Sequence, residues 1–151
     1  MYKSIVVGVD GSETARAAML KATELARLTG ARVHLVTASP KGRLAEMITL
    51  DPMAAGMTEM LKRTEDELAS ASADLLKRVA EEVRKGGVDA ETYLVEDDPA
   101  DAIIGVAESA GADLIVVGNK GMRGAKRFVL GSVPNAVAHR APCDVTIVST
   151  T

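Results

Sequence analysis

Short runs of valine and isoleucine alternate with longer helical patterns along this chain of 151 residues. Strands that are separated by helices favour a parallel sheet with helices on both faces, because parallel strands need a crossover connection. Ligands bind to such sheets beyond the carboxyl ends of the strands, where the strand order reverses. We therefore predict one α/β domain over residues 1–151, with strands at residues 3–9, 32–38, 88–95, 113–117 and 144–148.

Four helical patterns lie between these strands, and most have a recognisable start or end. Side-chain oxygens and proline favour a helix start, and glycine favours its end. Residues 39–56 are different, because their periodicity is weak and they contain several prolines and glycines. They predict a long mobile connection, either a ligand gate or a surface insertion without a role. The predicted helices run from Ser12 as cap to Gly30, from Leu61 to Gly86, from Asp98 and Pro99 onward, and from Ser132 as cap to about His139.

Composition and charge exclude several classes of protein. The single cysteine, Cys143, excludes an intramolecular disulfide and is compatible with a reducing cytosol. No stretch approaches the roughly 20 apolar residues of a membrane span, and the first strand begins too early for a signal peptide to precede it. The net charge of −3 leaves no domain-wide basic face for nucleic acid. We expect a cytoplasmic protein whose partners include neither membrane nor nucleic acid.

A glycine-rich loop follows the fourth predicted strand. Gly118, Gly121, Gly131 and Ser132 stand in the spacing G-x2-G-x9-G-S. From Gly118 to Arg140 there are five basic residues and no acidic one, although the whole chain is acidic. Glycine lets backbone N–H groups approach an anion, and a helix N-terminus adds partial positive charge. The pattern indicates phosphate binding, and the alternative is a turn that needs glycine for backbone reasons alone.

Several better-known nucleotide and metal motifs are absent from the sequence. There is no G-x4-G-K-[ST] and no G-x-G-x-x-G after the first strand, which excludes a P-loop NTPase and argues against dinucleotide binding. His34 and His139 are isolated, and no histidine and cysteine cluster has zinc spacing. The glycine loop offers donors and cations but no carboxylate that could act as a base. The sequence therefore favours binding over catalysis and assigns no catalytic residue.

Two segments far apart in the chain form a recognisable pair. Residues 5–12 read Ile-Val-Val-Gly-Val-Asp-Gly-Ser, and the glycine loop continues through Gly131 and Ser132 into Val133. Together they resemble the universal stress protein family, over essentially the whole chain from residue 3 to residue 148. The resemblance implies a three-layer Rossmann-like sandwich with a five-stranded parallel sheet in the order 3-2-1-4-5. That order places the first and fourth strands side by side, so both segments would face one crevice.

The resemblance also implies an adenine-nucleotide site in that crevice. The carboxylate of Asp10 would accept hydrogen bonds from ribose hydroxyls or from the adenine amino group, or it would only satisfy backbone amides of the first helix. Gly131, Ser132 and Val133 would donate to phosphate, although Pro134 lacks an N–H. Lys120, Arg123, Lys126 and Arg127 are unranked candidates for neutralising the phosphates. The implied nucleotide-binding residues are Gly8, Val9, Asp10, Ala38, Gly118, Asn119, Lys120, Gly121, Arg123, Gly131, Ser132 and Val133.

The function implied by the resemblance is that of an ATP-binding regulatory protein of the stress response, with or without Mg²⁺. The alternatives are a slow ATPase or another ATP-dependent enzyme, a sensor of AMP or cyclic AMP, and an interaction module that needs no ligand. The last strand, residues 143–148, would lie at a sheet edge with β-branched residues on both faces. An exposed edge of this kind recruits another strand, so we expect a homodimer through the C-terminal strand.

Overall fold

Strands and helices alternate through the part of the chain that the computed structural model describes, residues 1–39, 57–120 and 129–150. All five predicted strands and all four predicted helices are present, with shifts of a few residues at their ends. The predicted connection at 39–56 lies outside the described residues, apart from Ser39. The elements are β1 (Ser4–Gly8), α1 (Glu13–Thr29), β2 (Arg32–Ala38), α3 (Thr58–Lys85), β3 (Ala90–Val95), α4 (Pro99–Ser109), β4 (Leu114–Gly118), α5 (Ser132–Arg140) and β5 (Asp144–Val148).

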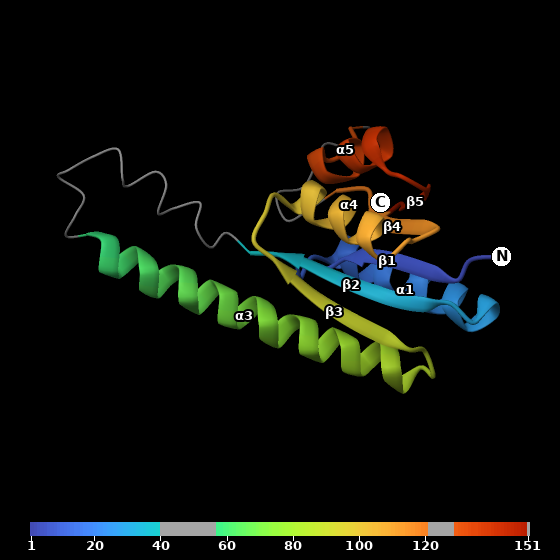
Figure 1. The fold of residues 1–151 in the computed structure, drawn as a ribbon, viewed down its shortest axis with the longest axis horizontal. Helices are drawn as coiled ribbons and strands as arrows, with labels where there is room; N and C mark the ends of the chain where they lie inside the picture. The colour runs from blue at the N-terminus through green and yellow to red at the C-terminus, as the bar shows by residue number, and fades with distance from the viewer. Residues whose placement is uncertain (40–56, 121–128, 151) are drawn as a thin grey trace.

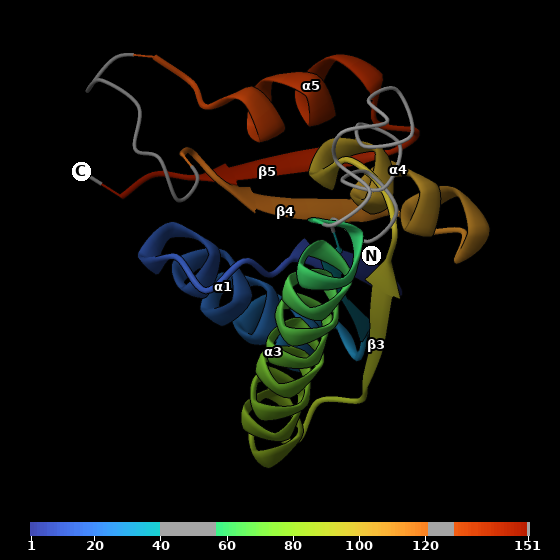
Figure 2. The same cartoon turned by 90° about the vertical axis from the view of Figure 1, so that its left-hand side faces the viewer.

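The five strands form one parallel sheet in the order β3-β2-β1-β4-β5, as predicted. β1 pairs with β2 on one side and with β4 on the other, so the strand order reverses at β1 and β4. α1 and α3 cover one face of the sheet, and α4 and α5 cover the other (Figures 1 and 2). The molecule is therefore a three-layer sandwich of the Rossmann-like kind.

Alternate residues of the central strands supply two separate apolar cores. Ile5 and Val7 point to the α1 and α3 side, where small alanines of α1 pack closely on the sheet. Val6 and Val36 point to the opposite side and contact the core around α4 and α5. Because both faces of the central strands are covered, these strands read as continuous runs of valine and isoleucine.

Local capping signals place most helix ends where they were predicted. Ser12 caps α1 by accepting a hydrogen bond from an α1 backbone N–H, and Gly30 ends the helix with a φ of 75°. Asp98 caps α4, and Pro99 occupies its first position. The prediction that Ser132 caps α5 is wrong. Gly131 is the cap residue, with extended backbone at φ −59° and ψ 163°, so the helix begins at Ser132 itself.

None of the helices within the described residues combines the length and the apolar composition that a membrane span requires.

Candidate functional site

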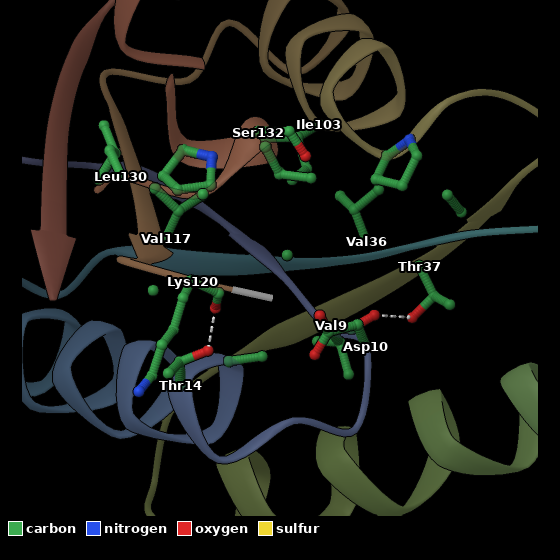
Figure 3. A pocket seen from close by; sticks show the side chains of 18 of the residues that line it. Val9, Asp10, Thr14, Val36, Thr37, Ile103, Val117, Lys120, Leu130 and Ser132 are labelled. Atoms are coloured by element: carbon green, nitrogen blue, oxygen red, sulfur yellow. Dashed lines mark hydrogen bonds between the residues drawn. The ribbon is translucent and has the colours of Figure 1, made fainter. Parts of the chain in front are cut away.

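A cavity of about 630 Å³ lies at the carboxyl ends of β1, β2 and β4, where the strand order reverses (Figure 3). Its walls also include the first turn of α1, the middle of α3 and the starts of α4 and α5. The two sequence segments predicted to face one crevice therefore do so. Nine of the predicted site residues line this cavity: Gly8, Val9, Asp10, Ala38, Gly118, Lys120, Gly131, Ser132 and Val133.

Three predicted site residues do not appear in the lining. Gly121 and Arg123 lie outside the described residues, as do the other basic candidates, Lys126 and Arg127. The side-chain oxygen of Asn119 accepts hydrogen bonds from the Thr150 backbone N–H at 3.2 Å and from its hydroxyl at 3.1 Å. Asn119 therefore ties the end of β4 to the C-terminal segment, and its contact with a ligand stays a prediction.

The floor of the cavity is apolar and is fixed by backbone contacts. Val36, Ile103 and Val117 are buried and contribute their side chains to it (Figure 3). Val9 donates its backbone N–H to the carbonyl of Val36 at 2.7 Å, and its own carbonyl accepts from the Thr37 hydroxyl at 2.8 Å. These bonds hold the ends of β1 and β2 together beside the apolar slot.

Asp10 is exposed at the end of β1, and its carboxylate has a structural contact. One oxygen, Oδ1, accepts from the Ser12 backbone N–H at 2.8 Å and from the Ser12 hydroxyl at 2.5 Å. The sequence alone left open that Asp10 only satisfies backbone amides at the start of the first helix. For Oδ1, this interpretation agrees with the structure. Oδ2 has no hydrogen-bond partner among the residues that the structure describes. The carboxylate can therefore brace the helix start and still accept a hydrogen bond from a ligand.

Close packing of α1 on β4 requires glycine at position 118, which the sequence did not indicate. A Cβ atom added there would lie 2.7 Å from the Cβ of Thr14 and 2.8 Å from its carbonyl carbon and oxygen. Backbone atoms cannot move aside, so only glycine lets α1 approach the end of β4 this closely. The Thr14 hydroxyl also donates to the carbonyl of Lys120, two residues further on (Figure 3). At Gly118, therefore, tight packing accounts for the glycine before any ligand is considered.

The start of α5 offers fewer anion donors than the sequence predicted. The N–H of Gly131 donates to the carbonyl of Asn119 at 2.9 Å, so it is engaged within the protein. Pro134 has no N–H to offer. Ser132 and Val133 occupy the first two helical positions, where N–H groups have no partner within the helix. Among the residues that the structure describes, these two N–H groups and the Ser132 hydroxyl are the donors that the start of α5 offers to the cavity.

The charges on the described lining are few. Asp10 at the end of β1 and Lys120 after β4 are the charged side chains among the described lining residues. Within the described ranges, no cluster of three or more histidine, cysteine, aspartate or glutamate side chains could hold a metal ion. His34 lies elsewhere, buried in β2 with its Nδ1 2.9 Å from the Tyr93 hydroxyl. His139 is exposed on α5.

Several lining residues were not identified from the sequence. Val36 and Val117 lie near the carboxyl ends of buried strands, and that position alone could have indicated them. No local sequence pattern marks the lining residues on α1, α3 and α4, because the packing of these helices on the sheet brings them to the cavity. The lining residues that sequence analysis missed are Thr14, Ala15, Val36, Thr37, Ser72, Leu75, Pro99, Ile103, Val117, Val129, Leu130 and Pro134.

Comparisons with known proteins agree with this architecture. The model of the family described as "Universal stress protein family" matches residues 1–149. A universal stress protein of Mycobacterium tuberculosis (strain ATCC 25618 / H37Rv) is 34% identical over 150 residues, covering 99% of this chain and 98% of the relative. A solved universal stress protein from Archaeoglobus fulgidus, in complex with dAMP, is 30% identical with a TM-score of 0.70, covering 97% of each chain. A solved universal stress protein in complex with cAMP is also 30% identical, with a TM-score of 0.68, covering 99% of this chain and 98% of the other.

Proposed function

This chain belongs to the universal stress protein family, and on that premise we propose that it binds an adenine nucleotide as a regulatory protein of the cytoplasmic stress response. The observation that carries the proposal is the cavity at the switch between β1 and β4. It combines an apolar slot, a carboxylate at one strand end and a helix N-terminus with a nearby lysine. Two relatives at 30% identity were solved with the adenine nucleotides cAMP and dAMP.

Each part of the cavity suits one part of a nucleotide. The apolar floor suits the flat face of adenine, with the backbone of Ala38 beside its edge. The Oδ2 atom of Asp10 can accept a hydrogen bond from a ribose hydroxyl or from the adenine amino group. Phosphate fits the opposite end, where Ser132 and Val133 present N–H groups with the helix dipole, and Lys120 is the positively charged residue of the described lining.

The candidate nucleotides differ in the number of phosphates that they carry. The family resemblance implied ATP, with or without Mg²⁺, and ATP stays the first candidate. The donor set at α5 favours a second candidate, AMP or cyclic AMP, because the N–H of Gly131 is engaged and Pro134 has none. Two N–H groups and one hydroxyl match the oxygens of a single phosphate group. The complexes of the relatives with cAMP and dAMP favour the same candidate.

Titration calorimetry with ATP, AMP, cyclic AMP and adenosine tests the proposal directly. At least one nucleotide should bind more tightly than adenosine, because phosphate adds contacts at α5 and Lys120. Mass spectrometry of small molecules that copurify with the native protein identifies the physiological ligand. Failure of all four ligands to bind would contradict the proposal and favour the interaction module that needs no ligand.

The rate of ATP hydrolysis distinguishes a binding protein from a slow ATPase. We propose binding without efficient catalysis, since the described lining near Ser132 and Lys120 contains no carboxylate beside the phosphate end. Incubation with labelled ATP measures hydrolysis. Turnover faster than about one per minute would favour an enzyme, since typical turnover numbers are far higher than that.

We also propose a homodimer through β5. The strand order puts β5 at the edge of the sheet, where one side of its backbone faces no strand within the described chain. Ile147 is 37% exposed on this strand, and its neighbours are β-branched. A two-fold axis would let the same segment pair with its own copy.

A further inference from the structure

The first turn of α1 touches both ends of the candidate site. Thr14, the second residue of α1, is 4% exposed and lines the cavity. Its hydroxyl donates to the carbonyl of Lys120, which is 106 residues away in the sequence. The backbone carbonyl of Thr14 also lies against Gly118, where a Cβ atom would approach the carbonyl carbon and oxygen to 2.8 Å. Two independent contacts therefore join this turn to the point where the chain leaves β4 for the glycine loop.

The same turn also holds the carboxylate of Asp10. Ser12, the cap of α1, donates both its backbone N–H and its hydroxyl to Oδ1 of Asp10. Both charged residues of the described lining are thus attached within three residues of one helix start, Asp10 by its carboxylate and Lys120 by its backbone carbonyl. The attachment to Asp10 runs through Ser12, and the attachment to Lys120 runs through Thr14.

The two attachments are separate hydrogen bonds. Each hydroxyl carries one proton: that of Ser12 goes to Asp10, and that of Thr14 goes to the Lys120 carbonyl. The two hydroxyl oxygens approach to 3.2 Å, but no proton is left to lie between them. Removing the Thr14 hydroxyl therefore frees the Lys120 carbonyl and leaves Asp10 held by Ser12.

We propose that Thr14 is a positioning residue for phosphate, whose buried hydroxyl fixes the Lys120 carbonyl and with it the start of the glycine loop. This inference rests on the proposed nucleotide site and assigns the residue that orders its phosphate end. Thr14 acts through Lys120 and the loop, whereas Asp10 serves the nucleoside end. Residues that are already fixed at the start of the loop lose less conformational freedom when phosphate binds.

Thr14→Val removes the hydroxyl and keeps the branched shape, and Thr14→Ser keeps the hydroxyl. The probe is whichever of ATP, AMP and cyclic AMP binds the wild-type protein most tightly, with adenosine measured by competition. Thr14→Val should weaken the nucleotide about two- to tenfold, the range for one net hydrogen bond, and leave adenosine unchanged. Thr14→Ser should stay within about twofold of wild type for both ligands.

Thr23→Val is the matched control. Thr23 is also a buried threonine of α1, but its hydroxyl bonds to the Met19 carbonyl within the helix at 2.8 Å and does not line the cavity. This variant should keep wild-type affinity for nucleotide and adenosine. Amide hydrogen exchange in the ligand-free proteins gives a second measurement, and the amides of Asn119 and Lys120 should exchange faster in Thr14→Val than in Thr23→Val.

The outcomes separate the two proposals. Equal loss for nucleotide and adenosine in Thr14→Val, failure of Thr14→Ser to restore binding, or wild-type affinity in Thr14→Val would each overturn the role of Thr14. If the wild-type protein binds neither nucleotide nor adenosine, the proposed function fails instead. In that case the amide exchange rates of Asn119 and Lys120 in Thr14→Val still test whether Thr14 holds the start of the loop. Rates equal to those in Thr23→Val would overturn this role of Thr14.

Discussion

The missing side chain at Gly118 lets the first turn of α1 rest against the end of β4. We expect Gly118→Ala to lower the free energy of unfolding by about 1–3 kcal/mol, because the new Cβ would overlap the backbone of Thr14. The same shift moves the start of the glycine loop, so nucleotide binding should weaken too. Urea unfolding followed by circular dichroism measures the stability of the variant.

Gly105→Ala provides the control for that experiment. Gly105 lies within α4, and a Cβ atom there would meet nothing within 4 Å. Alanine should therefore stabilise the helix by roughly 0.5–1 kcal/mol, as it does at other exposed helical glycines. A Gly118→Ala variant that is as stable as wild type would show that the contact with Thr14 is looser than the structure indicates.

The carboxylate of Asp10 has two tasks that substitutions can separate. Asp10→Asn keeps a side-chain oxygen for Ser12 and removes the charge, whereas Asp10→Ala removes both. We expect Asp10→Ala to lose about 1 kcal/mol of stability and Asp10→Asn to lose less, because Asp10→Ala leaves the helix start without its acceptor. Both should weaken adenosine and hardly affect inorganic triphosphate, by calorimetry. Equal weakening of both ligands would mean that Asp10 acts through structure rather than recognition.

Among elements, β2 and β3 share a polar cluster at the outer part of the sheet. His34 is buried and contacts the hydroxyl of Tyr93, which donates to Glu91 at 2.8 Å. Arg32 bonds to Glu91 and to Asp89. Burial lowers the pKa of His34 below its ordinary value, an effect that nearby Glu91 partly opposes, Arg32 reinforces and Asp89 opposes. His34 therefore takes up a proton less readily in the folded protein than in the unfolded chain.

This difference predicts a pH dependence of stability. The unfolded chain binds the His34 proton as pH falls below about 6.5, whereas the folded protein binds it only at lower pH. The contribution of neutral His34 to the stability of the folded protein is thus fully present above pH 6.5. It is lost as the pH falls through the lowered pKa of the folded protein. His34→Gln should reduce the loss of stability between pH 7.5 and 5, measured by urea unfolding. His139→Gln, at an exposed histidine of α5, is the control, and equal pH profiles for His34→Gln and wild type would contradict the prediction.

The elements themselves were largely predictable, because their signals are local. Ser12, Gly30 and Asp98 mark helix ends through bonds and backbone angles that involve only neighbouring residues. The start of α5 was misplaced because Gly131 and Ser132 are both acceptable at a cap, and only the backbone angles of Gly131 decide between them. The contact between Gly118 and Thr14 joins residues that are distant in sequence, so no local pattern could reveal it.

For the whole molecule, the strand order predicts a testable assembly. Val145→Pro and Ile147→Lys should convert a β5-paired dimer into a monomer, since proline removes a backbone donor and lysine places a charge at the edge. Light scattering measures the mass. Leu28→Lys, at a residue of α1 that is 75% exposed, places a charge outside the sheet edge and should leave the mass unchanged. A dimer that persists in both β5 variants would place the interface elsewhere.

The sequence placed the candidate site well at the strand ends and poorly on the helices. Val9, Asp10 and Gly118 follow from where buried runs end, because parallel strands bring their carboxyl ends to one edge. Ser72 and Leu75 reach the cavity only because α3 crosses the sheet at a particular angle. Side-chain packing between α3 and the sheet sets that angle, and local patterns in a single sequence do not predict it.

The pairing of β1 with β4 has a consequence for the growing chain during translation. Lys3 and Ser4 bond to Asp113, 109–110 residues further on, and Ile5 pairs with Leu114. A ribosome releases the first half of the cavity long before β4 and the start of α5 have been synthesised. A nascent chain that stops before β4 has no crevice to fill, so capture of the small molecule requires a polypeptide that has been made at least as far as the start of α5.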